Sequence, residues 1–182
     1  MYGMIHKAAR EFSTERLGPE AWVKLQDRAG LNSEHFISGQ HYGDDVTVKL
    51  LGEIAGELGC GLEDLLREFG RYWICFTSKS DYASVMDMAG DDLVTFLQNL
   101  DALHSSIKAT MPEASLPSFQ VLSHDETAIE LVYRSEREGL TVFVQGLLEG
   151  LMQRFSEEGT VSASVDDDGI VFRISKHQSK AA

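Results

Sequence analysis

Cysteine, proline and long apolar runs are all scarce in this 182-residue sequence. The two cysteines, Cys60 and Cys75, lie far apart, which favours two buried, reduced thiols, and a zinc site would need further ligands. Three prolines and no low-complexity segment argue against a long linker. No apolar run reaches the roughly 18 residues of a membrane span, and no leader-like N-terminus is seen. These absences predict a cytoplasmic protein with no membrane insertion.

Positive charge is also scarce, since 16 lysines and arginines stand against 29 aspartates and glutamates and give a formal net charge of −13. Such a surface repels phosphate backbones, so nucleic-acid binding is not expected. A glycine-rich phosphate loop, a nucleophile elbow and a paired acid–base constellation are missing as well. We therefore do not expect an enzyme. Hydrophobic residues, at 43%, suffice for a packed interior.

The apolar pattern divides the chain into a helical first two thirds and a mixed final third. Helical spacing and end signals predict helices over residues 2–17, from Pro19 onward, and over 44–58, 61–73 and 90–109. Beyond Pro112 and Pro117 come two strand-like runs, SFQVL and AIELVY, then a helical stretch, GLTVFVQGLLEGLMQRF, and a hairpin, TVSASV-DDDG-IVFRIS. We predict an α+β fold with a helical N-terminal part and a C-terminal part of helices and a small antiparallel sheet.

His104 is the histidine best placed to face the interior. It continues a stripe of apolar residues at three- and four-residue steps, namely Leu93, Phe96, Leu97, Leu100, Leu103 and Ile107. One interpretation is a core histidine bonded to a backbone carbonyl. The other is a metal ligand, because a neutral imidazole in an apolar wall holds a haem iron from one side. A single histidine does not complete a four-ligand zinc site, so haem, whose porphyrin supplies four ligands, fits best.

Three hydrogen-bond donors stand at every second position of the run at residues 128–140: Tyr133, Ser135 and Arg137. In an extended segment alternate side chains share a face, so these donors would point at one place. One interpretation is an edge strand whose surface arginine pairs with Glu136 or Glu138. The other is an anion clamp, because an arginine fork and two neutral donors suit carboxylates. Haem carries two carboxylates that are costly to bury in an acidic protein without donors, so the clamp and His104 form one hypothesis.

The sequence resembles the H-NOX family of haem-nitric oxide/oxygen-binding domains, which includes the sensor region of the soluble guanylate cyclase β subunit. The resemblance covers essentially the whole chain. It rests on MYG at 1–3, YGDDVT at 42–47, FGRYW at 69–73, FLQNLDALH ending at residue 104, LPSF at 116–119 and YRSEREGL at 133–140. The family's Y-x-S-x-R motif is met at every specified position.

The resemblance implies a single H-NOX domain over residues 1–182. It implies a helical N-terminal subdomain at about 1–62, a C-terminal haem-binding subdomain at about 63–182, and a b-type haem between them. By the same resemblance His104 is the proximal iron ligand, and Pro117 presses on the porphyrin and distorts it. A proline there is also explained by the end of a helix or the start of a strand. The implied propionate-binding residues are Tyr133, Ser135 and Arg137.

The choice of gas depends, by the same resemblance, on a hydroxyl donor on the distal side of the haem. In oxygen-binding members a tyrosine on the helix after the donor motif supplies it, whereas this chain places Val142 or Phe143 there. The other distal residues that the resemblance implies are Ile5, Ala9 and Trp73. An apolar wall favours nitric oxide and carbon monoxide over oxygen, although the Trp73 indole and Thr141 are possible donors. In a protein without haem the same residues would be ordinary core.

The function that these inferences predict is haem-based gas sensing. Nitric oxide would bind the ferrous haem, the bond between iron and His104 would be lost, and the helix that carries His104 would shift as the haem relaxes. Output would pass to a separate protein, since stand-alone bacterial members of the family act on a histidine kinase or a cyclic-di-GMP synthase or phosphodiesterase. The alternatives are an oxygen-binding haem sensor or carrier, and a haem-free adaptor.

Overall fold

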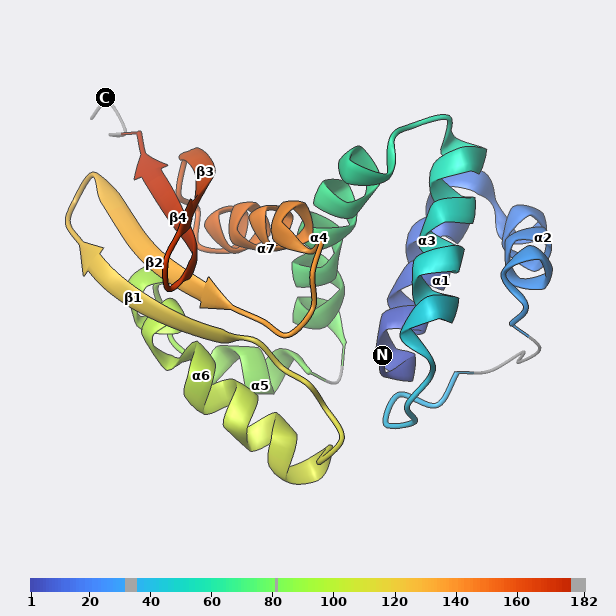
Figure 1. Cartoon of the computed structure of the whole chain (residues 1–182), viewed down its shortest axis with the longest axis horizontal. Helices are drawn as coiled ribbons and strands as arrows, with labels where there is room; N and C mark the ends of the chain where they lie inside the picture. Colours follow the sequence, from blue (N-terminus) through green and yellow to red (C-terminus); the bar gives the residue numbers. More distant parts are fainter. Residues whose placement is uncertain (32–35, 81, 178–182) are drawn as a thin grey trace. The chain divides into compact units, whose positions relative to one another are not determined.

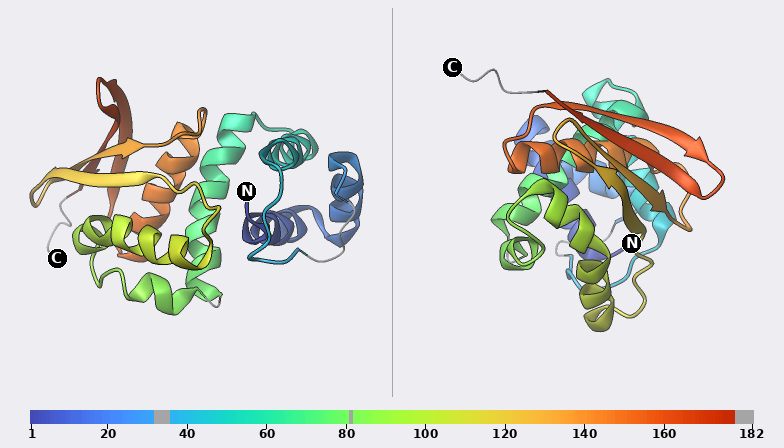
Figure 2. Two further views of the ribbon diagram at one scale, coloured as in Figure 1. Left: turned by 60° about the horizontal axis from the view of Figure 1, so that its bottom comes forward. Right: turned by 90° about the vertical axis from the view of Figure 1, so that its left-hand side faces the viewer.

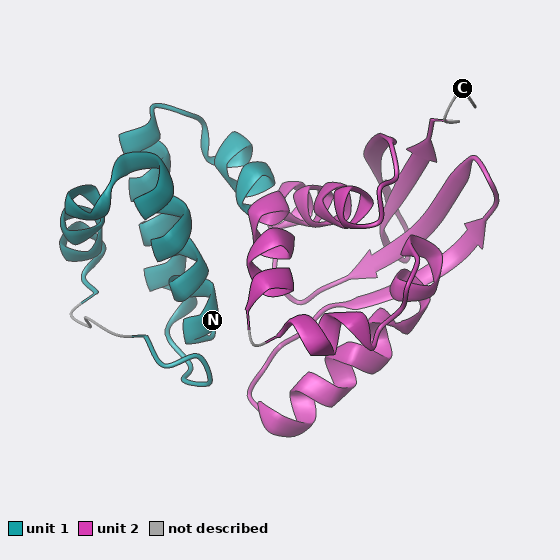
Figure 3. Ribbon diagram, turned by 180° about the vertical axis from the view of Figure 1, so that it is seen from behind, with its two compact units in different colours: residues 1–69 teal, residues 70–182 magenta. Residues whose placement is uncertain are grey.

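A computed structural model of the chain describes residues 1–31, 36–80 and 82–177 (Figure 1). The described residues confirm the α+β class. The elements follow in the order α1 (Gly3–Leu17), α2 (Pro19–Ala29), α3 (Asp44–Leu58), α4 (Leu62–Lys79), α5 (Ala83–Asp87), α6 (Leu93–Thr110), β1 (Ser118–His124), β2 (Ala128–Arg134), α7 (Thr141–Arg154), β3 (Gly159–Asp166) and β4 (Gly169–Lys176). The chain forms two compact units, residues 1–69 and 70–182, and the division falls within α4 (Figure 3).

Unit 1 is a small helical core. α1 packs against α2 and α3, and α2 packs against α3. Its most buried side chains include Phe12, Leu25, Leu50 and Ile54. The chain enters α1 through Gly3, where no side chain fits, because an added Cβ would lie 2.1 Å from the backbone oxygen of Ile37. This close approach gives a physical reason for the glycine of the MYG motif.

His6 is enclosed in the core of unit 1. Its side chain is fully buried and its Nε2 lies 2.9 Å from Thr47 Oγ1. The ring centroids of Phe36 and Tyr42 are each 4.9 Å from that of His6. The buried Nδ1 has no hydrogen-bond partner among the described residues. Burial lowers the pKa of His6 from 6.5 to about 4, so the imidazole stays neutral in the folded protein at neutral pH.

The stability of the protein is expected to fall as the pH decreases from about 6.5 to about 4. Within this range the unfolded chain binds a proton at His6 that the folded chain does not bind. The free energy of unfolding should therefore drop by about 2 kcal/mol between pH 7 and pH 5 through this group alone. Denaturant unfolding at a series of pH values measures the effect. His6→Gln, which stays uncharged, should flatten this part of the curve, whereas His124→Gln at an exposed position should not. An unchanged slope in His6→Gln would contradict the assignment.

Unit 2 is built on a four-stranded antiparallel sheet of order β1-β2-β4-β3 (Figure 2). The cross-strand pairs Ile129 with Ile174 and Leu131 with Phe172 point to one face, and all four side chains are fully buried. α6 packs against β1, and α7 packs against β3 and β4. Residues of both helices belong to the same buried cluster as those pairs, so both helices cover this face of the sheet.

Some details differ from the sequence-based predictions. α5 was not predicted, because a helix of 5 residues is too short to show a periodic pattern. β1 extends through Ser123 and His124, beyond the predicted strand-like run SFQVL, which ends at Leu122. The prediction of two buried thiols was wrong, since Cys75 is exposed and Cys60 is only partly buried. Cys75 follows the buried Ile74 by one position on α4, which turns its side chain outward.

None of the helices in residues 1–31, 36–80 and 82–177 has the length and apolar character needed to cross a bilayer.

Candidate functional site

The helix α6 brings a histidine to the edge of the core of unit 2. Asp92 caps the helix, because its Oδ1 accepts a hydrogen bond of 3.0 Å from Thr95 N. The predicted apolar stripe is buried as far as Leu100 and only partly buried beyond it. His104 lies on this less buried part, so its ring is half-buried rather than enclosed.

The imidazole of His104 is held in one tautomer. Its Nδ1 lies 2.8 Å from the backbone oxygen of Pro117, and a carbonyl can only accept, so Nδ1 must be the donor. The lone pair of Nε2 remains available, and no partner for it is found among the described residues. Burial lowers the pKa of His104, although the Pro117 carbonyl and the charge of Asp101 act to raise it. A neutral imidazole whose second nitrogen donates to a carbonyl is the form in which histidine binds a metal.

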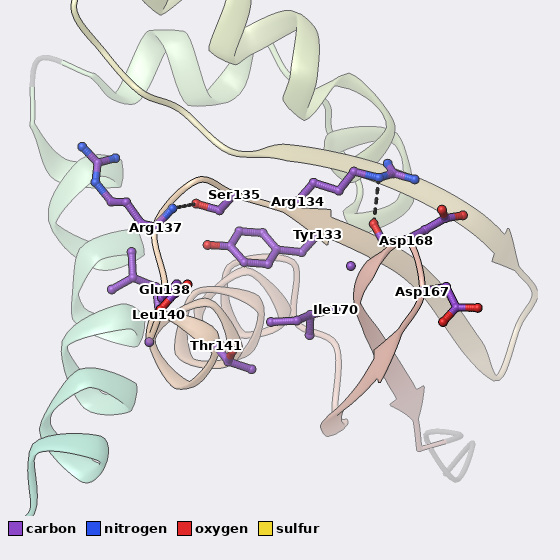
Figure 4. Close-up of a pocket in the computed structure, with 12 residues that line it drawn as sticks. Tyr133, Arg134, Ser135, Arg137, Glu138, Leu140, Thr141, Asp167, Asp168 and Ile170 are labelled. Atoms are coloured by element: carbon purple, nitrogen blue, oxygen red, sulfur yellow. Dashed lines mark hydrogen bonds between the residues drawn. The ribbon is translucent and has the colours of Figure 1, made fainter.

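The three predicted donors lie at and beyond the end of β2. We had expected the alternation of an extended strand to include Ser135 and Arg137. β2 ends at Arg134, so this expectation was wrong. The turn after the strand gathers the donors instead, since Arg137 N donates to Ser135 Oγ at 3.0 Å. All three line one pocket of about 510 Å³. In this pocket the phenol of Tyr133 points toward Ser135 and Arg137, while Arg134 extends the other way and donates to the carbonyl of Asp168 at 3.0 Å (Figure 4).

Tyr133 is the buried member of the donor group, with 4% of its surface exposed. Burial raises the pKa of its phenol, although a hydrogen bond with Ser135 and the charge of Arg137 act to lower it. The phenol therefore stays protonated at neutral pH and can donate. The opposite wall of the pocket comes from the turn between β3 and β4, including Asp167 and Asp168.

The segment at residues 115–119 connects the histidine with the donors. His104 Nδ1 donates to the carbonyl of Pro117 at 2.8 Å, and Arg137 Nη1 donates to the carbonyl of Ser115 at 2.5 Å. The imidazole and the guanidinium are thus bound to carbonyls only two residues apart. The structure brings the predicted iron ligand and the predicted clamp to one short stretch of chain.

A ring contact joins the two groups as well. The ring centroid of Phe119 lies 5.9 Å from that of His104 and 5.2 Å from that of Tyr133. Phe119 is itself 6% exposed, so it connects the half-buried ring of His104 with the buried ring of Tyr133. Within the register of the sheet, Phe119 pairs directly with Tyr133.

Asp101 was not predicted from the sequence. Its carboxylate accepts hydrogen bonds of 2.7 Å from Ser118 Oγ and from Phe119 N. The only signal in the sequence was its spacing of three positions before His104, which places both side chains on one side of a helix.

The residues present fit a haem better than a metal ion held by protein ligands alone. No group of three or more histidine, cysteine, aspartate or glutamate side chains that could hold an ion is found in the part of the chain that the structure describes. His104 would therefore be a single protein ligand, and the cofactor would have to supply the others. Donors for carboxylates lie next to it in the structure, which matches the chemistry of a porphyrin with propionates.

The predicted distal residues are divided between the two units. Ile5 and Ala9 lie on α1 in unit 1, whereas Trp73 on α4 and Phe143 on α7 lie in unit 2. Ala9 is buried and the other three are half-buried. Their assembly into one wall stays a prediction. No hydrogen-bond acceptor for the Trp73 indole N–H is found among the described residues.

Residues 2–163 match the family model described as HNOB, haem-NO-binding. The soluble guanylate cyclase gcy-35 of Caenorhabditis elegans is 28% identical over 165 residues, which cover 88% of this chain and 24% of that protein. The guanylate cyclase soluble subunit beta-2 of Rattus norvegicus is 32% identical over 117 residues, which cover 64% of this chain and 17% of that protein. The chain thus spans about a quarter of the length of these relatives, or less.

Two solved structures of an H-NOX protein from S. oneidensis share the fold. A triple mutant in the Fe(II) ligation state gives a TM-score of 0.88 at 21% identity and covers 99% of this chain and 98% of its own. The Fe(II)NO ligation state gives a TM-score of 0.86 at 21% identity and covers 98% of this chain and 100% of its own.

Proposed function

Because the chain belongs to the haem-NO-binding (H-NOX) family, we propose that it is a haem-based sensor of nitric oxide that acts on a separate signalling protein. Family membership makes it a gas-sensing haem domain. The finer parts of the proposal are a b-type haem, a preference for nitric oxide and carbon monoxide over oxygen, a cytoplasmic location and no catalytic activity of its own. The proposed partner is a histidine kinase or a cyclic-di-GMP synthase or phosphodiesterase.

One observation carries the proposal: a neutral His104 with an available Nε2 and Arg137 of the donor group are both hydrogen-bonded to the short segment at residues 115–117. We assign Nε2 of His104 to the iron and Pro117 to the porphyrin face beside it. When bound, the haem supplies the iron that takes up the gas. Each charge-assisted bond from the protein to a propionate contributes about 1.5–3 kcal/mol to holding it. The donors are Tyr133, Ser135 and Arg137.

The proposed signal is the release of His104 from the iron when nitric oxide binds. Most residues of α6 beyond His104 are exposed, so few packing contacts resist a movement of its last turns. The bond from Nδ1 to the Pro117 carbonyl ties the ring to the segment that leads into β1. A displaced ring would therefore move both the end of α6 and the start of the sheet, which gives two states that one ligand can bias.

The absorption spectrum of the purified protein, ferrous and with or without nitric oxide, tests the proposal. A Soret band that persists through purification and shifts when nitric oxide is added is the expected result. A preparation without a Soret band, even after reconstitution with haem, would favour the haem-free adaptor.

The choice of gas is tested by exposure of the ferrous protein to air. Since Val142 and Phe143 carry no hydroxyl, we expect no oxygen-bound spectrum in the wild type, because bound oxygen has partial negative charge and needs a donor. Val142→Tyr and Phe143→Tyr each place a phenol on the first turn of α7, and one of them is expected to bind oxygen measurably. The matched control for Val142→Tyr is Val142→Phe, which adds the ring without the hydroxyl. The matched control for Phe143→Tyr is the wild type, which already carries the ring. An oxygen-bound wild type would overturn the preference for nitric oxide.

Oxygen binding is the second candidate function, and one observation favours it. The indole N–H of Trp73 has no acceptor among the described residues and could donate to a bound gas. Under this alternative the wild type forms a stable oxygen complex that Trp73→Phe loses.

A further inference from the structure

Asp101 joins α6 to the start of β1. It lies three positions before His104, and both of its carboxylate oxygens are engaged. Oδ2 accepts from Ser118 Oγ at 2.7 Å, and Oδ1 accepts from Phe119 N at 2.7 Å. Hydrogen bonds to an ionised carboxylate are roughly twice as strong as neutral ones. The first two residues of β1 are therefore held firmly against the helix.

The residue just before this pair is Pro117, whose carbonyl accepts from Nδ1 of His104. That carbonyl belongs to the same planar peptide unit as the nitrogen of Ser118. The proline ring fixes φ on the other side of the residue, so little freedom remains in the carbonyl once Ser118 is held. Residues 117–119 are thus hydrogen-bonded to the side chains of Asp101 and His104, which lie on one side of α6.

We propose that Asp101 is a positioning residue that sets the strength of the bond between His104 and the iron, by holding the Pro117 carbonyl where it accepts from Nδ1. This inference rests on the proposed function, since it takes His104 as the iron ligand. Such outer partners fix the orientation of a metal-binding histidine and raise its basicity, and their loss costs about 10–100-fold in metal affinity.

The charge of Asp101 acts in the same direction as its hydrogen bonds. Burial has the largest influence on the pKa of His104 and lowers it, and the negative charge of Asp101 opposes this only in part by favouring positive charge on the nearby imidazole. A more basic imidazole is a stronger donor to iron. Removal of the charge and displacement of the carbonyl would both weaken the bond to the metal, so the two effects reinforce each other.

A purely structural Asp101, which only joins α6 to β1, would behave differently. It would lower the free energy of unfolding when removed but leave the iron–histidine bond unchanged in every molecule that still folds. The iron–histidine stretching band in the resonance Raman spectrum of the ferrous protein separates the two roles, because its frequency reports the strength of this one bond.

The experiment compares Asp101→Asn, Ser118→Ala and Asp91→Asn as full-length, haem-loaded proteins. Asp101→Asn keeps the shape of the side chain but removes its charge, so we expect a lower stretching frequency and about tenfold faster loss of haem to excess apomyoglobin. Ser118→Ala removes one of the two bonds and should give a smaller shift in the same direction. Asp91→Asn makes the same change of charge at an exposed position just before α6, for which no hydrogen bond is found among the described residues, and should give no shift.

Wild-type frequency and wild-type haem loss in both Asp101→Asn and Ser118→Ala would overturn the inference. If Asp101→Asn fails to fold, Ser118→Ala decides the question, because it deletes a single hydroxyl. A wild-type protein that binds haem but shows no iron–histidine band would instead contradict the assignment of His104. Failure of this inference is therefore distinguishable from failure of the proposed function.

Discussion

Replacing His104 with glycine is expected to remove nearly all of the Soret absorbance from the purified protein. Nε2 of this residue is the available nitrogen on α6, and no group of three or more side chains that could hold a metal ion is found in the described part of the chain. The propionate donors would remain in the variant, but without a bond to the iron they hold only one edge of the cofactor. The measurement is the ratio of Soret to protein absorbance after purification.

A control variant and rescue by free imidazole make this test specific for His104. His124→Gly changes an exposed histidine at the end of β1 and should keep the wild-type ratio. Free imidazole added to His104→Gly is expected to restore haem binding, because it supplies the missing ligand without a covalent link to α6. The restored protein should bind nitric oxide yet fail to move the helix. A His104→Gly variant that retained haem and passed on the signal unaided would refute the assignment.

The helix that carries His104 could be predicted from the sequence because its evidence is local. A helical repeat of apolar residues and an aspartate at its start follow from neighbouring positions, whereas the loss of burial after Leu100 was not predicted. The same is true of α3, which ends where Gly59 adopts a φ of 70°. The three donors, too, were expected to lie close together, and all three line one pocket.

The reason for that cluster could not be predicted, because strand ends depend on distant partners. Alternation along an extended chain was the argument, but the pairing of β2 with β4 stops at Tyr133 and Ile170. Beyond this pair the turn, and not the strand, brings Ser135 and Arg137 together. Asp101 was missed for the same reason, since its partners lie across a loop on β1. Contacts made only in the folded chain leave no periodic trace in the sequence.

The effect of a substitution at Gly70 also depends on a contact that the sequence does not reveal. This substitution has the largest expected effect on the free energy of unfolding. Alanine is the better helix former by up to about 1 kcal/mol, so the sequence alone predicts that Gly70→Ala stabilises α4. The structure predicts the opposite. A Cβ at this position would lie 2.3 Å from Phe143 O and 2.8 Å from Leu147 N, both backbone atoms of α7. Backbone atoms cannot change rotamer as a side chain can, so α7 would have to move as a whole to accommodate the added Cβ.

The two helices are fixed to each other nearby, which makes this movement costly. Arg71 Nη1 lies 2.6 Å from Glu149 Oε2, and a Cβ on Gly150 would lie 2.9 Å from Ile74 Cγ1. Gly70→Ala is therefore expected to lower the free energy of unfolding by about 3 kcal/mol, at the upper end of the cost of overpacking. Urea unfolding of the purified protein measures the change.

Gly52→Ala is the matched control, because Gly52 lies on the exposed face of α3 with no atom within 4 Å of an added Cβ. There the helix propensity acts alone and should raise stability by about 0.5–1 kcal/mol. The two substitutions are chemically identical and should differ in sign. Equal effects would mean that α4 and α7 do not approach as closely as described.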